Sequence, residues 1–296
     1  MYQPARGVNS EKRASFLSRM DHPLYFYSAL PTRPARAAGL SAYVVLCLEH
    51  WEAVQPEGAL RDPRFVGEFG SFTPDYRSWT QREYGLRIGV FRVLQALRDA
   101  GIRPAVAANA RAVERLPQLV EGLNAWGCEW IGHGLSANAM MHSRMPLAEQ
   151  RTHITHSLET LERCTGQRPR GWLSQDWGTT PETCSLLAEA GLRYTLDWSN
   201  DDQPYRMTPP LVALPLSAEW DDVQCQWLRN MTPRAHADIA LQAFDRLRAE
   251  GGAVFGLALH PWVSGMSSRI GALRELLLAL RSREGVRWAL PGELTK

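Results

Sequence analysis

The sequence predicts an α/β fold in which parallel strands alternate with helices around a barrel. Short apolar runs alternate with stretches of helical periodicity along almost the whole chain, as parallel βα units require. The apolar runs are hydrophobic throughout, which is typical of strands covered on both faces. No G-x-G-x-x-G turn follows a strand, and polar residues end successive strands instead. A barrel is therefore favoured over a doubly wound dinucleotide-binding sheet.

The expected elements follow one another in a regular order after residue 40. The first strand, 43–48, precedes a long irregular stretch, 51–80, rich in proline, glycine and aromatic residues. A helix at 86–101 shows apolar residues at helical spacing and ends at Gly101, which suits a C-cap. Further strands are expected at 104–109, 129–133, 170–174, 193–198, 211–217, 253–260 and 286–290, and further helices at 110–125, 147–164, 180–190, 234–250 and 269–282.

Composition indicates one globular domain. The 296 residues are 45% hydrophobic and 22% charged, enough to build a core. We expect residues 1–40 to be an N-terminal arm packed on a single barrel domain, 41–296. The net charge of +2 is too balanced to favour nucleic acid or an anionic membrane. No apolar run approaches the ~20 residues that cross a bilayer, and no secretory signal is visible. The expected location is cytoplasmic.

Polar side chains end many of the expected strands, and in a barrel these ends meet at one face. They are Glu49 and His50, Asn109, His133, Ser174 with Gln175, Asp197, Glu219 and His260. We therefore expect Glu49, His133 and His260 to share one pocket. Each also has a structural interpretation, as an exposed strand end for Glu49 and as a hydrogen-bonded core histidine for the other two.

Other side chains are weaker candidates, because each has an equally ordinary structural role. Asp201 and Asp202, in "LDWSNDDQPY", could bind a ligand or orient a histidine, and they could equally stabilise a turn. Glu83, in "REYGLR", could be a site residue or a helix N-terminal carboxylate. Trp172 could line the pocket or belong to the core. The two histidines of helix 147–164 are expected on a solvated face.

The order of these pieces resembles the polysaccharide deacetylase superfamily, in particular its metal-poor branch that includes allantoinases of urate catabolism. The stretches that carry the resemblance lie between about residue 25 and residue 296, and they are "LEHWE", "REYGLRIGVFR", "EWIGHGLSAN", "TGQRPRGWLS", "LLAEAGLRYTLDWSNDDQPY" and "LALHPW". The resemblance implies a distorted β/α barrel of about seven strands. It also implies a hydrolase of carbon–nitrogen bonds other than peptide bonds, acting on a small amide or ureide or an N-acetylated sugar.

The resemblance also implies roles for particular residues. Glu49 stands where the family's deacetylases have a catalytic base, and His50 stands where they have a metal-binding aspartate. His133 matches the first histidine of a His-x-x-x-His ligand pair, but Ala137 replaces the second. His260, in "LALH", matches the general acid. Glu49 and His260 are thus expected to be catalytic.

Further roles complete the expected site. Asp202 is expected to hold an imidazole in its tautomer or to bind substrate N–H groups. The expected substrate-binding residues are Glu83, Asn138, Trp172 and Asp201. His50 and His133 would bind one divalent metal ion such as Zn²⁺, together with a carboxylate from Glu49 or Glu83.

Two mechanisms and one non-catalytic alternative remain open. A metal ion would lower the pKa of its bound water. Without one, Glu49 could act as the base, provided that burial raises its pKa towards the working pH. The alternative is a binding barrel for carbohydrate or another small ligand, with an eroded metal site, which Ala137 favours. Apolar side chains in the arm and in 51–80 predict a homo-oligomer.

Overall fold

The computed structural model describes residues 39–59 and 74–295, and all structural statements concern these residues. Nine strands are present: β1 Leu40–Leu48, β2 Ala105–Ala108, β3 Glu129–Gly132, β4 Gly171–Trp172, β5 Tyr194–Thr195, β6 Tyr205–Arg206, β7 Val212–Ala213, β8 Val254–Leu259 and β9 Val286–Trp288. The expected N-terminal arm lies almost wholly outside the described residues, and so do residues 60–73 of the stretch 51–80.

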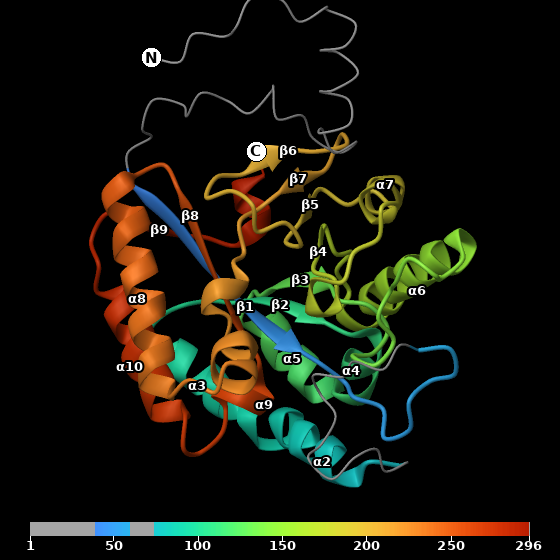
Figure 1. Ribbon diagram of the computed structural model, residues 1–296, viewed down its shortest axis with the longest axis horizontal. Helices are drawn as coiled ribbons and strands as arrows, with labels where there is room; N and C mark the ends of the chain where they lie inside the picture. The colour runs from blue at the N-terminus through green and yellow to red at the C-terminus, as the bar shows by residue number, and fades with distance from the viewer. Residues whose placement is uncertain (1–38, 60–73, 296) are drawn as a thin grey trace, which may run out of the picture.

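The strands form one curled sheet (Figure 1). Their order is β6-β7-β5-β4-β3-β2-β1-β8, with β9 paired to the start of β1. All pairs are parallel except β6 with β7. Seven parallel strands thus follow one another from β7 to β8, which confirms the expected distorted barrel of about seven strands.

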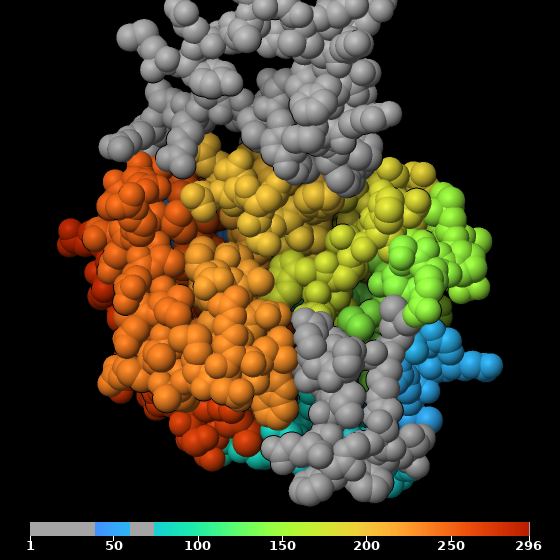
Figure 2. Space-filling view, in the orientation of Figure 1, coloured from blue at the N-terminus to red at the C-terminus, as the bar shows by residue number. Residues whose placement is uncertain are grey.

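Helices surround the outer face of this sheet (Figure 1). They are α2 Tyr76–Tyr84, α3 Val90–Asp99, α4 Ala110–Arg115, α5 Pro117–Ala125, α6 Leu147–Thr165, α7 Thr183–Glu189, α8 Pro233–Glu250, α9 Pro261–Ser264 and α10 Ile270–Arg281. Shorter turns are the π-helical η3 Gly85–Gly89 and η6 Val223–Leu228, and the 3₁₀ turns η4 Gln175–Trp177, η5 Ala218–Trp220 and η7 Pro291–Leu294. On the visible face, the yellow surface of 175–215 meets the orange surface of 220–250 (Figure 2).

Two expected elements differ in the structure for identifiable reasons. The helix expected over 110–125 is two helices, because Pro117 has no N–H and restricts the backbone of Leu116. The irregular stretch 51–80 ends in a helix, since α2 begins at Tyr76 with Asp75 as its N-cap. No helix in the described part of the chain is long and apolar enough to cross a membrane.

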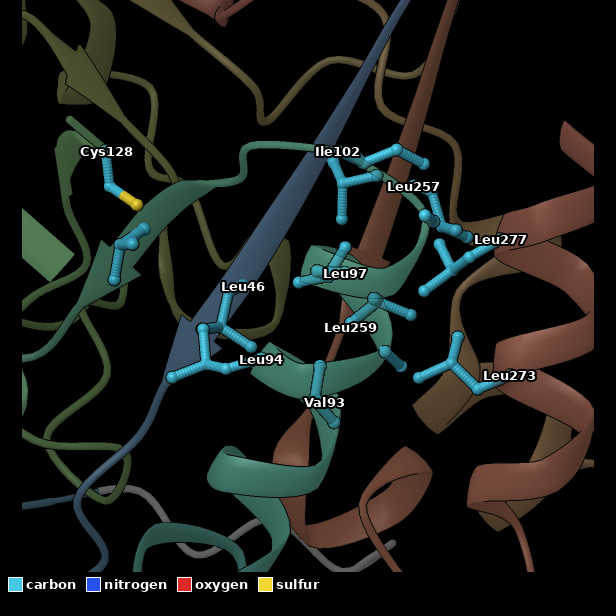
Figure 3. Close-up of a cluster of buried hydrophobic side chains, with 14 of the residues drawn as sticks. Leu46, Val93, Leu94, Leu97, Ile102, Cys128, Leu257, Leu259, Leu273 and Leu277 are labelled. Carbon is cyan, nitrogen blue, oxygen red and sulfur yellow. The ribbon is translucent and has the colours of Figure 1, made fainter. Parts of the chain in front are cut away.

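The side chains of β1 alternate between two cores. Leu46 and its even-numbered neighbours pack outward against α3 and α10, where Val93, Leu97 and Leu277 surround them (Figure 3). The odd-numbered side chains, such as Val45, pack into the inner core of the barrel. This alternation follows from strand geometry. It continues past the end of β1 and decides where the next two side chains point.

Candidate active site

Glu49, His133 and His260 meet in one pocket at the carboxyl ends of β1, β3 and β8. Glu49 Oε1 lies 3.7 Å from His133 Nε2 and 3.9 Å from His260 Nε2. All three side chains are buried, and none is more than 7% exposed. The pocket encloses a cavity of about 170 Å³. The sequence-based expectation that these three residues share a pocket therefore agrees with the geometry.

The Glu49 carboxylate is held by donors on both oxygens. The side-chain amide of Gln175 donates to Oε1, and Trp262 Nε1 donates to Oε2 at 2.8 Å. Burial alone would raise the pKa of Glu49, but the charge of His260, the neighbouring His133 imidazole and the hydrogen bond from Gln175 lower it to about 2. The role of Glu49 as a base was expected to require a pKa raised by burial, and this requirement is not met. Its side chain is a permanent carboxylate at neutral pH.

His260 is held by a pair of buried aspartates that the sequence reasoning missed. Its Nδ1 lies 2.6 Å from Asp222 Oδ1 and 3.5 Å from Asp221 Oδ2. Asp222 Oδ2 accepts hydrogen bonds from the His260 backbone N–H and from the Ser264 hydroxyl. These contacts orient the imidazole so that Nε2 faces Glu49 and the cavity.

The charge of His260 follows from the same neighbours. Burial alone would lower the pKa of His260, but the negative charges around it raise this pKa well above its usual value. Burial raises the pKa of the adjacent Cys47 thiol to about 11, so at neutral pH the relevant charges are those of Asp221, Asp222 and Glu49. Burial also raises the pKa of Asp221 to about 7. His260 is therefore a cation at neutral pH.

His133 presents its Nε2 to the cavity. Its Nδ1 donates to the Leu173 carbonyl at 2.6 Å, which fixes the tautomer. Nε2 is buried without a hydrogen-bond partner. The next residue, Gly134, has φ 79°, and a Cβ there would lie 2.8 Å from His153 Nε2. This glycine thus permits close packing against α6. His153 was expected on a solvated face, but it is buried.

His50 points away from this pocket, as the alternation of β1 dictates. Its Nδ1 accepts from Arg115 Nη1 at 2.8 Å, and its Nε2 lies 3.3 Å from Glu52 Oε2. Glu83, expected to bind substrate or metal, lies beside His50 at 3.7 Å and does not line the pocket. The structure therefore separates the two histidines that were expected to share a metal ion, His50 and His133.

Asp202 does not contact a catalytic imidazole. Its backbone carbonyl accepts from the N–H of Val254, the first residue of β8, whereas His260 follows the last residue of that strand, roughly 20 Å away. Asp201 accepts from the backbone N–H of Gln203 in an Asx turn. The structure thus supports the turn interpretation of Asp201, neither aspartate lines the pocket, and Asp222 makes the contact expected of Asp202.

Of the two remaining residues expected to bind substrate, one lines the pocket and the other does not. Asn138 lines the pocket, where its Oδ1 accepts from the backbone N–H of Glu52 at 2.6 Å. Trp172 is 1% exposed and packs in the core, and a Cβ on the neighbouring Gly132 would lie 2.5 Å from its ring. Trp172 is therefore a core residue and does not reach the pocket.

The structure adds residues that sequence reasoning did not assign. They are Asp221, Asp222, Arg82 and Trp262, all in or against the pocket wall, beside Gln175, which was expected only as one of the strand-end side chains. The adjacent acidic pair in "EWDDVQ" and the tryptophan two places after His260 were the available signals. Neither forms a pattern by itself, because acidic pairs and tryptophans are common in loops.

One group of side chains in the described part of the chain could hold a metal ion. Asp221, Asp222 and His260 offer ligand atoms within 4.8 Å of one another. However, Asp222 and His260 Nδ1 already bond to each other, and only Asp221 Oδ2 is buried without a hydrogen-bond partner. A catalytic zinc site uses three protein ligands that carry no proton. The donor set thus fits a buried imidazolium between two carboxylates better than it fits a divalent cation.

Comparisons with known proteins agree with this fold. The expected resemblance to the polysaccharide deacetylase superfamily is confirmed, and with it the α/β barrel fold. A Schizosaccharomyces pombe protein named "Putative polysaccharide deacetylase" is 26% identical over 230 residues, covering 69% of this chain and 70% of the relative. No family model matches the chain.

Solved structures with this fold include proteins of both named activities. A "probable Polysaccharide deacetylase" from Pseudomonas aeruginosa PAO1 is 25% identical with a TM-score of 0.74, covering 87% of this chain and 90% of that one. The PuuE allantoinase is 25% identical with a TM-score of 0.75, covering 89% and 93%. A Bacillus anthracis pseudoenzyme, at 13% identity and a TM-score of 0.53, shares the fold.

Proposed function

We propose that this protein hydrolyses a carbon–nitrogen bond in a small amide or ureide, using Glu49, His133 and His260. The observation that carries the proposal is the closeness of one buried carboxylate to two imidazole Nε2 atoms, at 3.7 Å and 3.9 Å. Hydrolysis of such a bond needs an activated water and an acid for the leaving nitrogen. The similarity to deacetylases and to an allantoinase supports the same reaction class.

The attacking water would lie between Glu49 and His133. Its two O–H groups would donate to Glu49 Oε1 and His133 Nε2, which are both acceptors in the resting site. With a pKa of about 2, Glu49 is too weak a base to keep a proton at neutral pH. We therefore assign the proton to His133 Nε2 as the C–O bond forms. The Glu49 carboxylate, 3.7 Å away, stabilises the imidazolium that results.

His260 would supply the proton to the leaving nitrogen. It is cationic at neutral pH, and its Nε2 faces the same carboxylate as His133 does. As the C–N bond breaks, the Nε2–H bond passes its proton to the nitrogen, giving a carboxylic acid and an amine. Asp222, at 2.6 Å from Nδ1, holds the ring in position for this transfer.

The cavity favours a small substrate. Its volume is about 170 Å³, and tryptophans at positions 51, 79, 177 and 262 line it. A cavity of this size is comparable to one that holds a single benzene-sized molecule. This size supports a small amide or ureide over a glycan chain, and an N-acetylated amino sugar is the second substrate to test.

The test is a hydrolysis screen of purified protein against allantoin, other cyclic and linear ureides, and N-acetylated amino sugars. Formation of amine and acid would be followed by chromatography, with Glu49→Gln as the matched control. We expect turnover of at least one small amide or ureide and a loss of about 100-fold or more in the control. Tight binding without turnover across the panel would overturn the proposal. It would instead favour a non-catalytic binding barrel, which Ala137 at the lost ligand position would suit.

A further inference from the structure

We propose that Arg82 is a positioning residue that acts through Trp262 to hold the Glu49 carboxylate in its reactive orientation. The inference deepens the proposed function, because it rests on Glu49 as part of the reaction centre. It also gives a role to the segment "REYGLRIGVFR", which the mechanism leaves unused.

Arg82 is a buried cation enclosed by indole rings. The residue is 3% exposed. Its guanidinium carbon lies 4.4 Å from the ring centroid of Trp51 and 4.5 Å from that of Trp262, with Trp227 at 5.6 Å. Cation–π attraction is strongest where the cation is desolvated. The guanidinium thus fixes the positions of the rings that enclose it.

Trp262 links Arg82 to the Glu49 carboxylate. Its Nε1–H donates to Glu49 Oε2 at 2.8 Å. Its ring meets Trp51 edge-on at 6.4 Å and Trp227 edge-on at 5.2 Å. Because an indole N–H lies in the ring plane, whatever fixes that plane also aims the N–H. Arg82 and the two neighbouring rings therefore set the direction of the hydrogen bond to Glu49.

The backbone around Arg82 is in direct contact with the backbone of α9. A Cβ on Gly85 would lie 2.6 Å from the Trp262 nitrogen, and one on Gly89 would lie 2.2 Å from the Pro261 carbonyl oxygen. Farther along, Arg92 Nη1 donates at 3.2 Å to the carbonyl of the residue that follows α9. The glycines of the segment are thus required for the close approach that brings the guanidinium to Trp262.

The charge of Arg82 also acts on Glu49. Burial lowers the pKa of Arg82 to about 10, while the negative charges of Glu49 and Asp75 oppose that shift. The side chain is therefore still a cation at neutral pH, and it supports an ionised Glu49.

The test uses Arg82→Met, which removes the charge but keeps a long side chain, with the exposed Arg87→Met as matched control. The first readout does not need activity: the ¹⁵N–¹H signal of the Trp262 indole, assigned with Trp262→Phe. We expect the wild-type N–H to be protected from exchange and Arg82→Met to exchange at least about tenfold faster. The control should match the wild type.

The second readout is steady-state kinetics on the substrate found in the screen. We expect Arg82→Met and Trp262→Phe to lower kcat about tenfold or more with little change in KM, and Arg82→Lys to recover only part of the loss, because ammonium lacks the planar group that stacks on indole. An unchanged indole signal in Arg82→Met would overturn the inference. A changed signal in a protein without turnover would leave the inference intact and contradict the proposed function instead.

Discussion

At the residue scale, the site depends on which carboxylates face which imidazoles. Glu49 is an ionised group with a pKa near 2, and Asp222 lies 2.6 Å from His260 Nδ1. Burial by itself would raise the pKa of a glutamate, whereas the pKa of Glu49 is lowered. The negative charges of Glu49 and Asp222 keep His260 protonated, as a general acid for the leaving group must be.

This assignment predicts the pH dependence of an Asp222→Asn variant. His260 acts in its protonated form, so activity should be lost as pH rises through its raised pKa. Removing the negative charge of Asp222 lowers that pKa, because a nearby opposite charge favours the protonated imidazole. The alkaline limb of kcat should therefore move to lower pH. Superimposable pH profiles of variant and wild type would contradict the role of Asp222.

The sequence could reveal only part of the site, for reasons visible at single residues. Glu49, His133 and His260 were predictable because each ends an apolar strand. His50 was misplaced because its role came from a motif position, whereas the alternation of β1 sends it to the opposite face. Asp222 was missed because it follows a two-residue strand and an irregular turn, with no periodicity to locate it.

At the scale of elements, the contact between η3 and α9 determines the pocket wall. The sequence indicated a helix from residue 86 but not the preceding helix α2, because its residues lie in a stretch dense in proline and aromatic side chains. The structure shows that Gly85 and Gly89 are needed for close approach of two backbones. A glycine in a helix is otherwise unfavourable.

Two matched glycine substitutions test this contact. Gly89→Ala puts a Cβ against the Pro261 carbonyl, and we expect it to reduce the free energy of unfolding by about 1–3 kcal/mol. Gly122→Ala in α5 meets no atom within 4 Å and should increase the free energy of unfolding by about 0.5–1 kcal/mol. Denaturant unfolding measures both. Equal effects of the two substitutions would contradict the steric role of Gly89.

At the scale of the whole molecule, the expected barrel is present, with seven parallel strands in one curled sheet. Alternating apolar strands and amphipathic helices were sufficient to predict it. They could not predict the short strand β6, which has two residues and is defined by its pairing with β7 rather than by a local pattern. The homo-oligomer expected from the sequence stays a prediction.

Charge balance in the core predicts how the whole protein responds to metal removal. The cationic imidazole of His260 offsets the charge of Asp222, and burial raises the pKa of Asp221 to about 7, so folding does not require a bound cation to neutralise the two aspartates. We expect exhaustive dialysis against a chelator to leave Tm unchanged within about 1 °C and to leave turnover unaltered. Loss of activity on chelation, with recovery on adding Zn²⁺, would contradict the interpretation that Asp221, Asp222 and His260 do not hold a metal ion.

The most direct test of the central claim is steady-state turnover of Glu49→Gln, His133→Gln and His260→Ala beside the exposed control Arg87→Met. The substrate is the one that the hydrolysis screen identifies, and circular dichroism would establish that each variant is folded. We predict losses in kcat of about 100-fold or more for each pocket variant and wild-type values for the control. Wild-type turnover in any folded pocket variant would contradict the reaction centre proposed for this protein.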